Sequence, residues 1–191
     1  MLSETLLGIT VGIGLSAACG FRVFMPLLVM NLAVLTGHLH LSSGFEWIGS
    51  HYATVAFGTA TIVEVLAYYI PWLDHVLDLI ASPAAIIAGT IATASLVMDI
   101  SPFLRWTLAI IAGGGAAAIV QGITVTLRTK SSVLTAGTGN VLISSAELVG
   151  SIITALLAIV VPVLCLILVA LFSIYVIWKA GRLFFGRIKI K

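Results

Sequence analysis

The chain has 191 residues, of which 61% are hydrophobic and only 8% carry a charge. A soluble globular domain carries roughly a quarter of its residues as charges, so this composition excludes an ordinary soluble protein. Because about 20 apolar residues are needed for one helical crossing of a bilayer, the length leaves room for five or six membrane segments with short loops. The long, continuous apolar stretches favour helices. We therefore predict an all-α, polytopic transmembrane helical bundle.

The formal net charge of +2 depends on basic residues gathered at the C-terminal end. Basic residues beside a last crossing favour a cytoplasmic location under the positive-inside rule. We predict that residues 1–178 form a single transmembrane domain and that residues 179–191 form a basic cytoplasmic tail. No folded basic domain accompanies this tail, so nucleic acid is not an expected partner. The basic residues of the tail are Lys179, Arg182, Arg187, Lys189 and Lys191.

The first apolar stretch, over residues 5–35, is too long for one straight crossing. It contains Gly20, Arg22 and Pro26 near its middle. We predict a broken or re-entrant segment near residues 20–26, since broken helices expose backbone groups in many transporters. A simple proline kink would explain the same residues.

The next predicted elements are two helices separated by an acidic connector. A polar loop over residues 37–51 has no Lys or Arg, which favours the non-cytoplasmic side. A helix over residues 52–70 follows, and Pro71 is predicted to break it. The connector then leads to Pro83, where a third helix is predicted to begin and to run to Met98.

A fourth helix is predicted over residues 103–127. Residues 131–145 are rich in Ser, Thr and Gly, with Gly139 and Asn140 as irregular backbone. We predict that this segment is broken or re-entrant, and a re-entrant hairpin is the preferred interpretation.

The last apolar run, over residues 141–178, would be about 55 Å long as one helix. It either projects from the bilayer, bends at Pro162 or begins as a re-entrant piece. The chain must turn back once between residues 131 and 178 if all the charges are to obey the positive-inside rule. Only then do Arg128, Lys130 and the basic tail lie on the cytoplasmic side while the 37–51 loop lies on the other side.

Small residues recur at four-residue steps on three of the predicted helices. Such stripes let helix backbones approach closely, which drives helix association in lipid. We therefore predict a compact bundle, and a spare stripe would support a homo-oligomer. The stripes are Gly8, Gly12, Ser16 and Gly20; Ala81, Ala85, Gly89 and Thr93; and Ala109, Gly113, Ala117 and Gln121.

Four charged residues lie in apolar surroundings: Arg22, Glu64, Arg128 and Glu147. A charge at the bilayer centre costs about 2.5–3.5 kcal/mol on insertion scales, so such residues face partners, cavities or substrates. Helical periodicity turns both glutamates toward the bundle interior. We predict a substrate-binding site in which the arginines hold an anionic group and the carboxylates balance charge or carry a proton. In the alternative interpretation, two buried Arg–Glu pairs only fix helix register.

Asp74, His75 and Asp78 are weak candidates for a divalent metal site, because Asp74 and Asp78 are one helical turn apart. A solvated acidic connector explains the same residues. No nucleophile motif or full metal signature accompanies them, so we expect neither a cofactor nor an enzyme.

The order of these motifs resembles a bacterial membrane-protein family, domain of unknown function 4126. The resemblance covers nearly the whole chain and implies a bacterial inner-membrane location, but no activity. It rests on Gly20, Phe21 and Arg22 with Pro26; on Glu64, Pro71, Asp74 and Asp78; and on Arg128, Ser131, Ser132, Gly139, Asn140, Ser144 and Glu147.

Three classes of function remain open. The first is a small transporter or channel for a small anionic solute or an anionic lipid headgroup, with the bilayer as its surroundings. The second is a non-catalytic membrane scaffold or assembly factor. The third is a divalent-ion-dependent enzyme acting on a lipid phosphate. The buried charges favour the first class.

Overall fold

The structure is a computed structural model that describes residues 2–70, 73–135 and 138–186. Within these ranges the regular structure is helical and contains no strand, which confirms the predicted helical bundle. The elements are α1 (Leu2–Cys19), α2 (Phe24–Leu35), the 3₁₀ turn η1 (Glu46–Gly49), α3 (His51–Ala67), α4 (Leu73–Leu96), α5 (Pro102–Leu108), a π segment (Ala109–Gly114), α6 (Gly115–Thr135), α7 (Asn140–Val160) and α8 (Pro162–Gly186).

Four stretches are long and apolar enough to cross a membrane. They are Val76–Leu96, Pro102–Thr135, Asn140–Val160 and Pro162–Lys179. Glu4–Cys19, Phe24–Leu35 and His51–Ala67 are shorter apolar helices. Their lengths and composition indicate a membrane protein.

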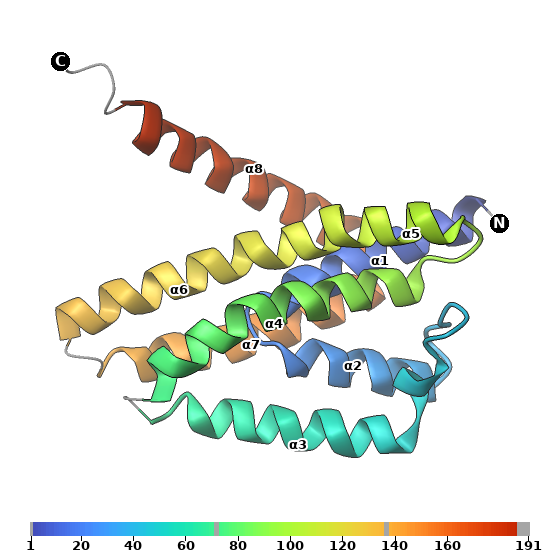
Figure 1. Ribbon diagram of the computed structural model, residues 1–191, viewed down its shortest axis with the longest axis horizontal. Coiled ribbons are helices and arrows are strands. Elements are labelled where there is room, and N and C mark those ends of the chain that lie inside the picture. The colour runs from blue at the N-terminus through green and yellow to red at the C-terminus, as the bar shows by residue number, and fades with distance from the viewer. Residues whose placement is uncertain (1, 71–72, 136–137, 187–191) are drawn as a thin grey trace.

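The first apolar stretch is broken, as predicted, and the chain reverses at the break. α1 ends at Cys19, residues 20–23 form a turn, and α2 starts at Phe24. Both helices lie between this turn and the right-hand side of Figure 1. The Ser95 hydroxyl of α4 donates to the sulfur of Met30, and the Leu96 carbonyl lies against Gly8. The outer ends of α1 and α2 therefore meet the same end of α4, so the two helices form a hairpin.

The tip of this hairpin reaches the middle of the long helices. Gly20 lies against Ala117 and Val120 of α6, and Phe21 lies against Gly150 of α7. These three contacts fall near the midpoints of Pro102–Thr135 and Asn140–Val160. If the long helices cross the bilayer, the tip lies near half its depth.

The glycine stripes predicted from the sequence hold α1, α4 and α6 together. A Cβ on Gly8 would overlap the Leu96 carbonyl oxygen, and one on Gly12 would lie 2.9 Å from Cα of Thr93. The Ser16 hydroxyl donates to the Gly89 carbonyl across the same interface. All three stripes are thus occupied within one chain. They do not supply the spare surface on which the oligomer prediction was based.

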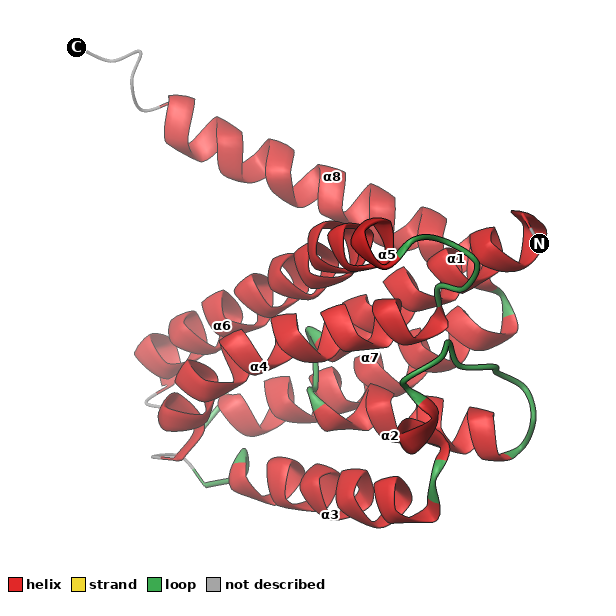
Figure 2. Cartoon of the chain, turned by 45° about the vertical axis from the view of Figure 1, so that its right-hand side comes forward, coloured by secondary structure: helices red, strands yellow, loops and turns green. Residues whose placement is uncertain are grey.

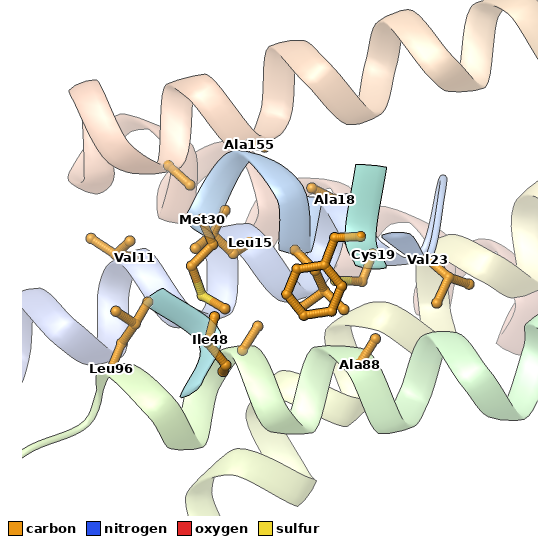
Figure 3. Close-up of a cluster of buried hydrophobic side chains, with 14 of the residues drawn as sticks. Val11, Leu15, Ala18, Cys19, Val23, Met30, Ile48, Ala88, Leu96 and Ala155 are labelled. Atoms are coloured by element: carbon orange, nitrogen blue, oxygen red, sulfur yellow. The ribbon is translucent and has the colours of Figure 1, made fainter. Parts of the chain in front are cut away.

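Apolar side chains fill the space around the hairpin. Figure 3 shows side chains from five elements in one cluster: Leu15 of α1, Met30 of α2, Ile48 of η1, Ala88 of α4 and Ala155 of α7. Each of these side chains is buried. The hairpin is therefore a core element of the bundle, whereas α3 and α8 lie at its edges (Figure 2).

The predicted connector before Pro83 is wrong. Residues 73–82 are helical, and Pro83 lies inside α4. Proline is tolerated within membrane helices, because neighbouring polar groups satisfy part of the freed backbone. Pro83 leaves the Leu79 carbonyl without its usual helical N–H partner, and the Ser82 hydroxyl donates to the preceding carbonyl, that of Asp78. Asp78 is therefore part of the long helix α4, and its side chain projects from that helix.

α5 and α6 form one continuous helix through the π segment. This segment packs on α4, where Gly113 lies against Thr93 and the carbonyl of Gly89. π turns are rare and occur mostly as single insertions within α-helices. The fourth predicted helix is therefore longer than expected, since it continues through Thr135.

The break predicted over residues 131–145 is a turn between two helices. α6 ends at Thr135, residues 138–139 form a turn, and α7 begins at Asn140. The segment is thus broken, and the preferred re-entrant hairpin is not formed there. The chain instead turns back at Pro162, where α7 ends and α8 returns toward the left of Figure 1. This places the C-terminal ends of α6 and α8 toward the left of Figure 1 and the connection between α2 and α3 toward the right.

Replacing Gly8 with alanine is expected to destabilise the protein, because the added methyl would overlap the Leu96 carbonyl oxygen. Overpacking of this kind costs about 1–3 kcal/mol. Gly122→Ala is the matched control, since nothing lies within 4 Å of a Cβ at that helical position. Thermal unfolding in one detergent should give a lower midpoint for Gly8→Ala and an unchanged or higher midpoint for Gly122→Ala. Equal midpoints would contradict the close α1–α4 contact.

Candidate functional site

The four charged residues singled out in the sequence are all buried beside the tip of the α1–α2 hairpin. Arg22 follows α1, Glu64 is on α3, Arg128 on α6 and Glu147 on α7. Their exposed fractions are 1%, 7%, 4% and 4%. The predicted inward orientation of both glutamates is therefore confirmed, and elements distant in sequence meet at one place.

Arg128 and Glu147 form the central ion pair. Nε of Arg128 donates to Oε1 of Glu147 at 2.9 Å, and Nη2 of Arg128 contacts Oε2 of the same carboxylate. A two-point contact of this kind fixes the relative orientation of both groups. Nη1 of Arg128 also donates to Asp78 of α4 at 3.3 Å. The pair therefore links α6, α7 and α4.

Arg22 reaches the same carboxylate from the hairpin. Its Nη2 lies 3.7 Å from Oε2 of Glu147 and donates to the carbonyl and the hydroxyl of Ser144. Nε and Nη1 of Arg22 are buried and have no hydrogen-bond partner within the described part of the chain. A buried donor without a partner is costly, and more so on a charged group. The Arg22 guanidinium therefore retains unused binding capacity.

Glu64 binds the backbone at the start of α2. Its two carboxylate oxygens accept from the N–H groups of Val23 at 2.9 Å and Phe24 at 3.1 Å. The first N–H groups of a helix have no partner inside the helix, and its N-terminus attracts negative charge. A carboxylate from α3 thus caps a helix that starts within the bundle.

Tyr68 connects the charged groups, and the sequence analysis missed it. The guanidinium carbons of Arg22 and Arg128 lie 4.1 and 3.8 Å from the centroid of its ring. Its hydroxyl donates to Asp78 at 3.2 Å. A cation over an aromatic face is stabilised by the ring quadrupole. One feature of the sequence could have identified Tyr68: it lies four residues after Glu64, which places both residues on one face of α3.

The residues predicted at structural breaks take several positions. Gly20 lies in the hairpin turn, and Pro26 lies in the first turn of α2, where proline needs no hydrogen-bond partner. Gly139 lies in the turn before α7, and Asn140 starts that helix and donates to Ser132. Pro71 lies outside the described residues.

The candidate metal site cannot be assembled from the described side chains. Asp78 contacts Arg128 and Tyr68, while the side chains of Asp74 and His75 lie outside the described part of the structure. Among the described residues there is no group of three potential metal ligands. The metal site therefore stays a prediction.

A family model described as "Domain of unknown function (DUF4126)" matches residues 9–182. The chain belongs to this family. No curated protein and no solved structure matches it. The DUF4126 match includes the hairpin, the charged cluster and most of α8, but its description states no activity. The chemistry of this DUF4126 member must therefore be argued from its own residues.

Two cavities border the charged cluster. One, of about 720 Å³, lies between α3 and α4, and Glu64 and Tyr68 form part of its wall. The other, of about 430 Å³, lies between α4 and α6, and Asp78 and Arg128 form part of its wall. The cluster is therefore bordered by an apolar cavity on one side of α4 and a more polar cavity on the other.

Glu147→Gln is expected to lower the free energy of unfolding by about 3–5 kcal/mol, as for other buried ion pairs that lose one partner. The substitution leaves the Arg128 and Arg22 guanidinium groups without their shared carboxylate. Unfolding of purified protein in detergent measures the change. Glu46→Gln, at an exposed position of η1, provides the control and should leave stability unchanged. A Glu147→Gln protein as stable as the wild type would mean that the pair does not contribute to folding.

Proposed function

We propose that this membrane protein is a small transporter or channel for anions, and that Arg22, Glu64, Arg128 and Glu147 form its substrate-binding site. The substrate is a small anionic solute or the headgroup of an anionic lipid. The observation that supports this proposal most directly is the pair of unpartnered nitrogens on buried Arg22. A guanidinium binds a carboxylate or a phosphate through several N–H groups at once, and Nε and Nη1 are donors of that kind.

The location of Arg22 supports the same function. It precedes a helix that starts in the interior of the bundle, where backbone N–H groups and the helix dipole favour an anion. In several transporter folds, interrupted helices direct such ends toward substrate near the middle of the bilayer. Glu64 occupies the N-terminus of α2 in this structure. A bound anion would share or take over that position.

The charges of the cluster favour uptake of a proton together with the anion. The described side chains supply two guanidinium groups, Arg22 and Arg128, and three carboxylates, Glu64, Asp78 and Glu147. A further negative charge in an interior of low dielectric constant would be strongly repelled. Protonation of one carboxylate removes this repulsion. We therefore include proton coupling in the proposal.

We also propose a bacterial inner-membrane location, with the ends of α6 and α8 on the cytoplasmic side. This rests on the positive-inside rule applied to Lys130, Lys179 and Arg182. A homo-oligomer remains a prediction without support from the helix contacts described above.

Arg22→Ala is expected to abolish anion binding, because it removes the donors that have no internal partner. Inorganic phosphate is a suitable probe: at constant ionic strength it should raise the unfolding temperature of the wild-type protein relative to chloride, since a ligand that binds only the folded state stabilises it. Arg22→Ala should show no phosphate-dependent shift. Vesicles with the wild-type protein should release phosphate with movement of protons, reported by an enclosed pH-sensitive dye.

Lys130→Ala is the control, because Lys130 is exposed at the end of α6. It should behave like the wild type in both assays. If wild type and Arg22→Ala responded alike, or if wild-type vesicles neither bound nor released phosphate, the proposed site would be rejected. The remaining interpretation would then be a scaffold whose ion pairs set helix register.

A further inference from the structure

A small pocket lies at the end of the bundle where α4 is joined to α5. Its volume is about 300 Å³. The loop after α2 contributes Ser42 and Ser43 to its wall, and the connection from α4 into α5 contributes Asp99, Pro102 and Arg105. In Figure 1 both of these connections lie at the right, away from the C-terminal ends of α6 and α8. The pocket is therefore separate from the charged cluster, none of whose residues lines it.

Arg105 brings a positive charge to this pocket. Its guanidinium carbon lies 5.8 Å from the centroid of the Phe45 ring, which itself lies 6.1 Å from the ring of Trp106. Nε of Arg105 is buried and has no hydrogen-bond partner among the described residues. A buried donor without a partner is costly, and more so on a charged group. The guanidinium is thus placed by an aromatic ring, and its N–H groups remain for a ligand.

Asp99 brings a negative charge to the same pocket. It is exposed, and in the described part of the chain it forms no ion pair with Arg105. A ligand with only a negative charge would be attracted by Arg105 but repelled by Asp99. A ligand that carries one anionic and one cationic group satisfies both side chains. Charge complementarity therefore favours a zwitterion.

The position of the pocket along the helices indicates the source of this zwitterion. The apolar stretch Val76–Leu96 ends beside the pocket, and Pro102–Thr135 begins there. In a bilayer crossed by these stretches, the pocket lies at the level of the lipid headgroups. Trp47 and Trp106, which are 53% and 42% exposed, belong to elements at this end of the molecule. Exposed tryptophan is typical of the membrane–water interface.

We propose that this pocket binds a phospholipid headgroup that carries a phosphate and a primary ammonium group, as in phosphatidylethanolamine. The phosphate lies on Arg105, because a guanidinium donates to two oxygens at once. The ammonium group lies on Asp99, because its three N–H groups can donate to a carboxylate. The exposed hydroxyl of Ser43 is a further donor for the phosphate.

The size of the pocket fits this ligand. A volume of about 300 Å³ is at the lower end of the range for small-molecule sites, so it holds a headgroup and not a whole lipid. The acyl chains then follow the outward faces of the helices, where exposed Phe103 and Leu104 begin the long stretch. The site is independent of the anion transport proposed above.

The test uses the full-length protein in detergent and native mass spectrometry to measure lipid binding. Phosphatidylethanolamine, phosphatidylcholine and phosphatidylglycerol with identical acyl chains are compared. Phosphatidylcholine keeps both charges, but its quaternary ammonium group has no N–H to donate, and phosphatidylglycerol lacks the positive charge. We expect phosphatidylethanolamine to bind about tenfold more tightly than either, since a hydrogen bond to a charged group contributes roughly this factor. Equal affinities for the three lipids would overturn the proposal.

Two substitutions locate the site. Arg105→Gln and Asp99→Asn should each weaken phosphatidylethanolamine binding about tenfold. Asparagine suits position 99, where φ is 61°. Asp99→Asn should also strengthen binding of phosphatidylglycerol, because it removes the repulsion of the phosphate. A misfolded protein would not show this gain, so the variant tests the site even if its stability changes.

Arg182→Gln is the matched control. Its guanidinium also lies over an aromatic ring, 5.5 Å from the centroid of Trp178, but on α8. It should bind all three lipids like the wild type. If Arg105→Gln and Asp99→Asn kept the wild-type preference for phosphatidylethanolamine, the pocket would be rejected as its site.

Arg22→Ala separates this proposal from the anion site. It should lose phosphate binding but keep the preference for phosphatidylethanolamine, because Arg22 does not line the pocket. A folded Arg22→Ala protein without this preference would place the lipid at the charged cluster and overturn the proposal. An unchanged preference together with unchanged phosphate binding would retain the lipid site and reject the transport site.

Discussion

The arrangement of this protein depends on satisfying a broken backbone away from water. A helix that starts inside a bundle leaves N–H groups without partners, and each such group is costly in an apolar environment. Glu64 meets this requirement for α2 by accepting from Val23 and Phe24. This contact connects α3 to the hairpin, although α3 otherwise lies at the edge of the bundle. The chain can therefore reverse inside the bundle without leaving these N–H groups unpaired.

The charged cluster extends this constraint to the long helices. Glu147 contacts both Arg128 and Arg22, so a single carboxylate links α6, α7 and the hairpin tip. Tyr68 adds α3 through its ring and α4 through its bond to Asp78. Any movement of the hairpin must change contacts in this network. The groups that hold the bundle together are therefore also the groups of the proposed anion site, and Nε and Nη1 of Arg22 are donors without a hydrogen-bond partner in the described part of the chain.

The sequence predicted most of the fold, because lipid imposes simple patterns on it. Apolar length identified most of the helices, and the four-residue spacing of small residues identified helix faces that pack closely, although the structure was needed to show that those of α1, α4 and α6 pack on one another. The inward orientation of Glu64 and Glu147 followed from helical periodicity. Other features depend on contacts that no local pattern encodes. Pro83 reads as a helix boundary, yet tertiary packing keeps it inside α4. Tyr68 was missed because an aromatic residue at a helix end has many roles, and only the fold brings both arginines to its ring.

The π segment Ala109–Gly114 has a consequence for how this chain tolerates changes in length. A π turn contains one residue more than an α turn, and successive residues of an α-helix differ in direction by about 100°. Because the extra residue is absorbed within about one full turn, deleting one residue there would restore regular α-helical hydrogen bonding and leave Arg128 facing Glu147. A deletion elsewhere in α6 ahead of Arg128 would instead turn this arginine away by about 100°. Homologues with and without the extra residue can therefore both keep the arginine–glutamate pair.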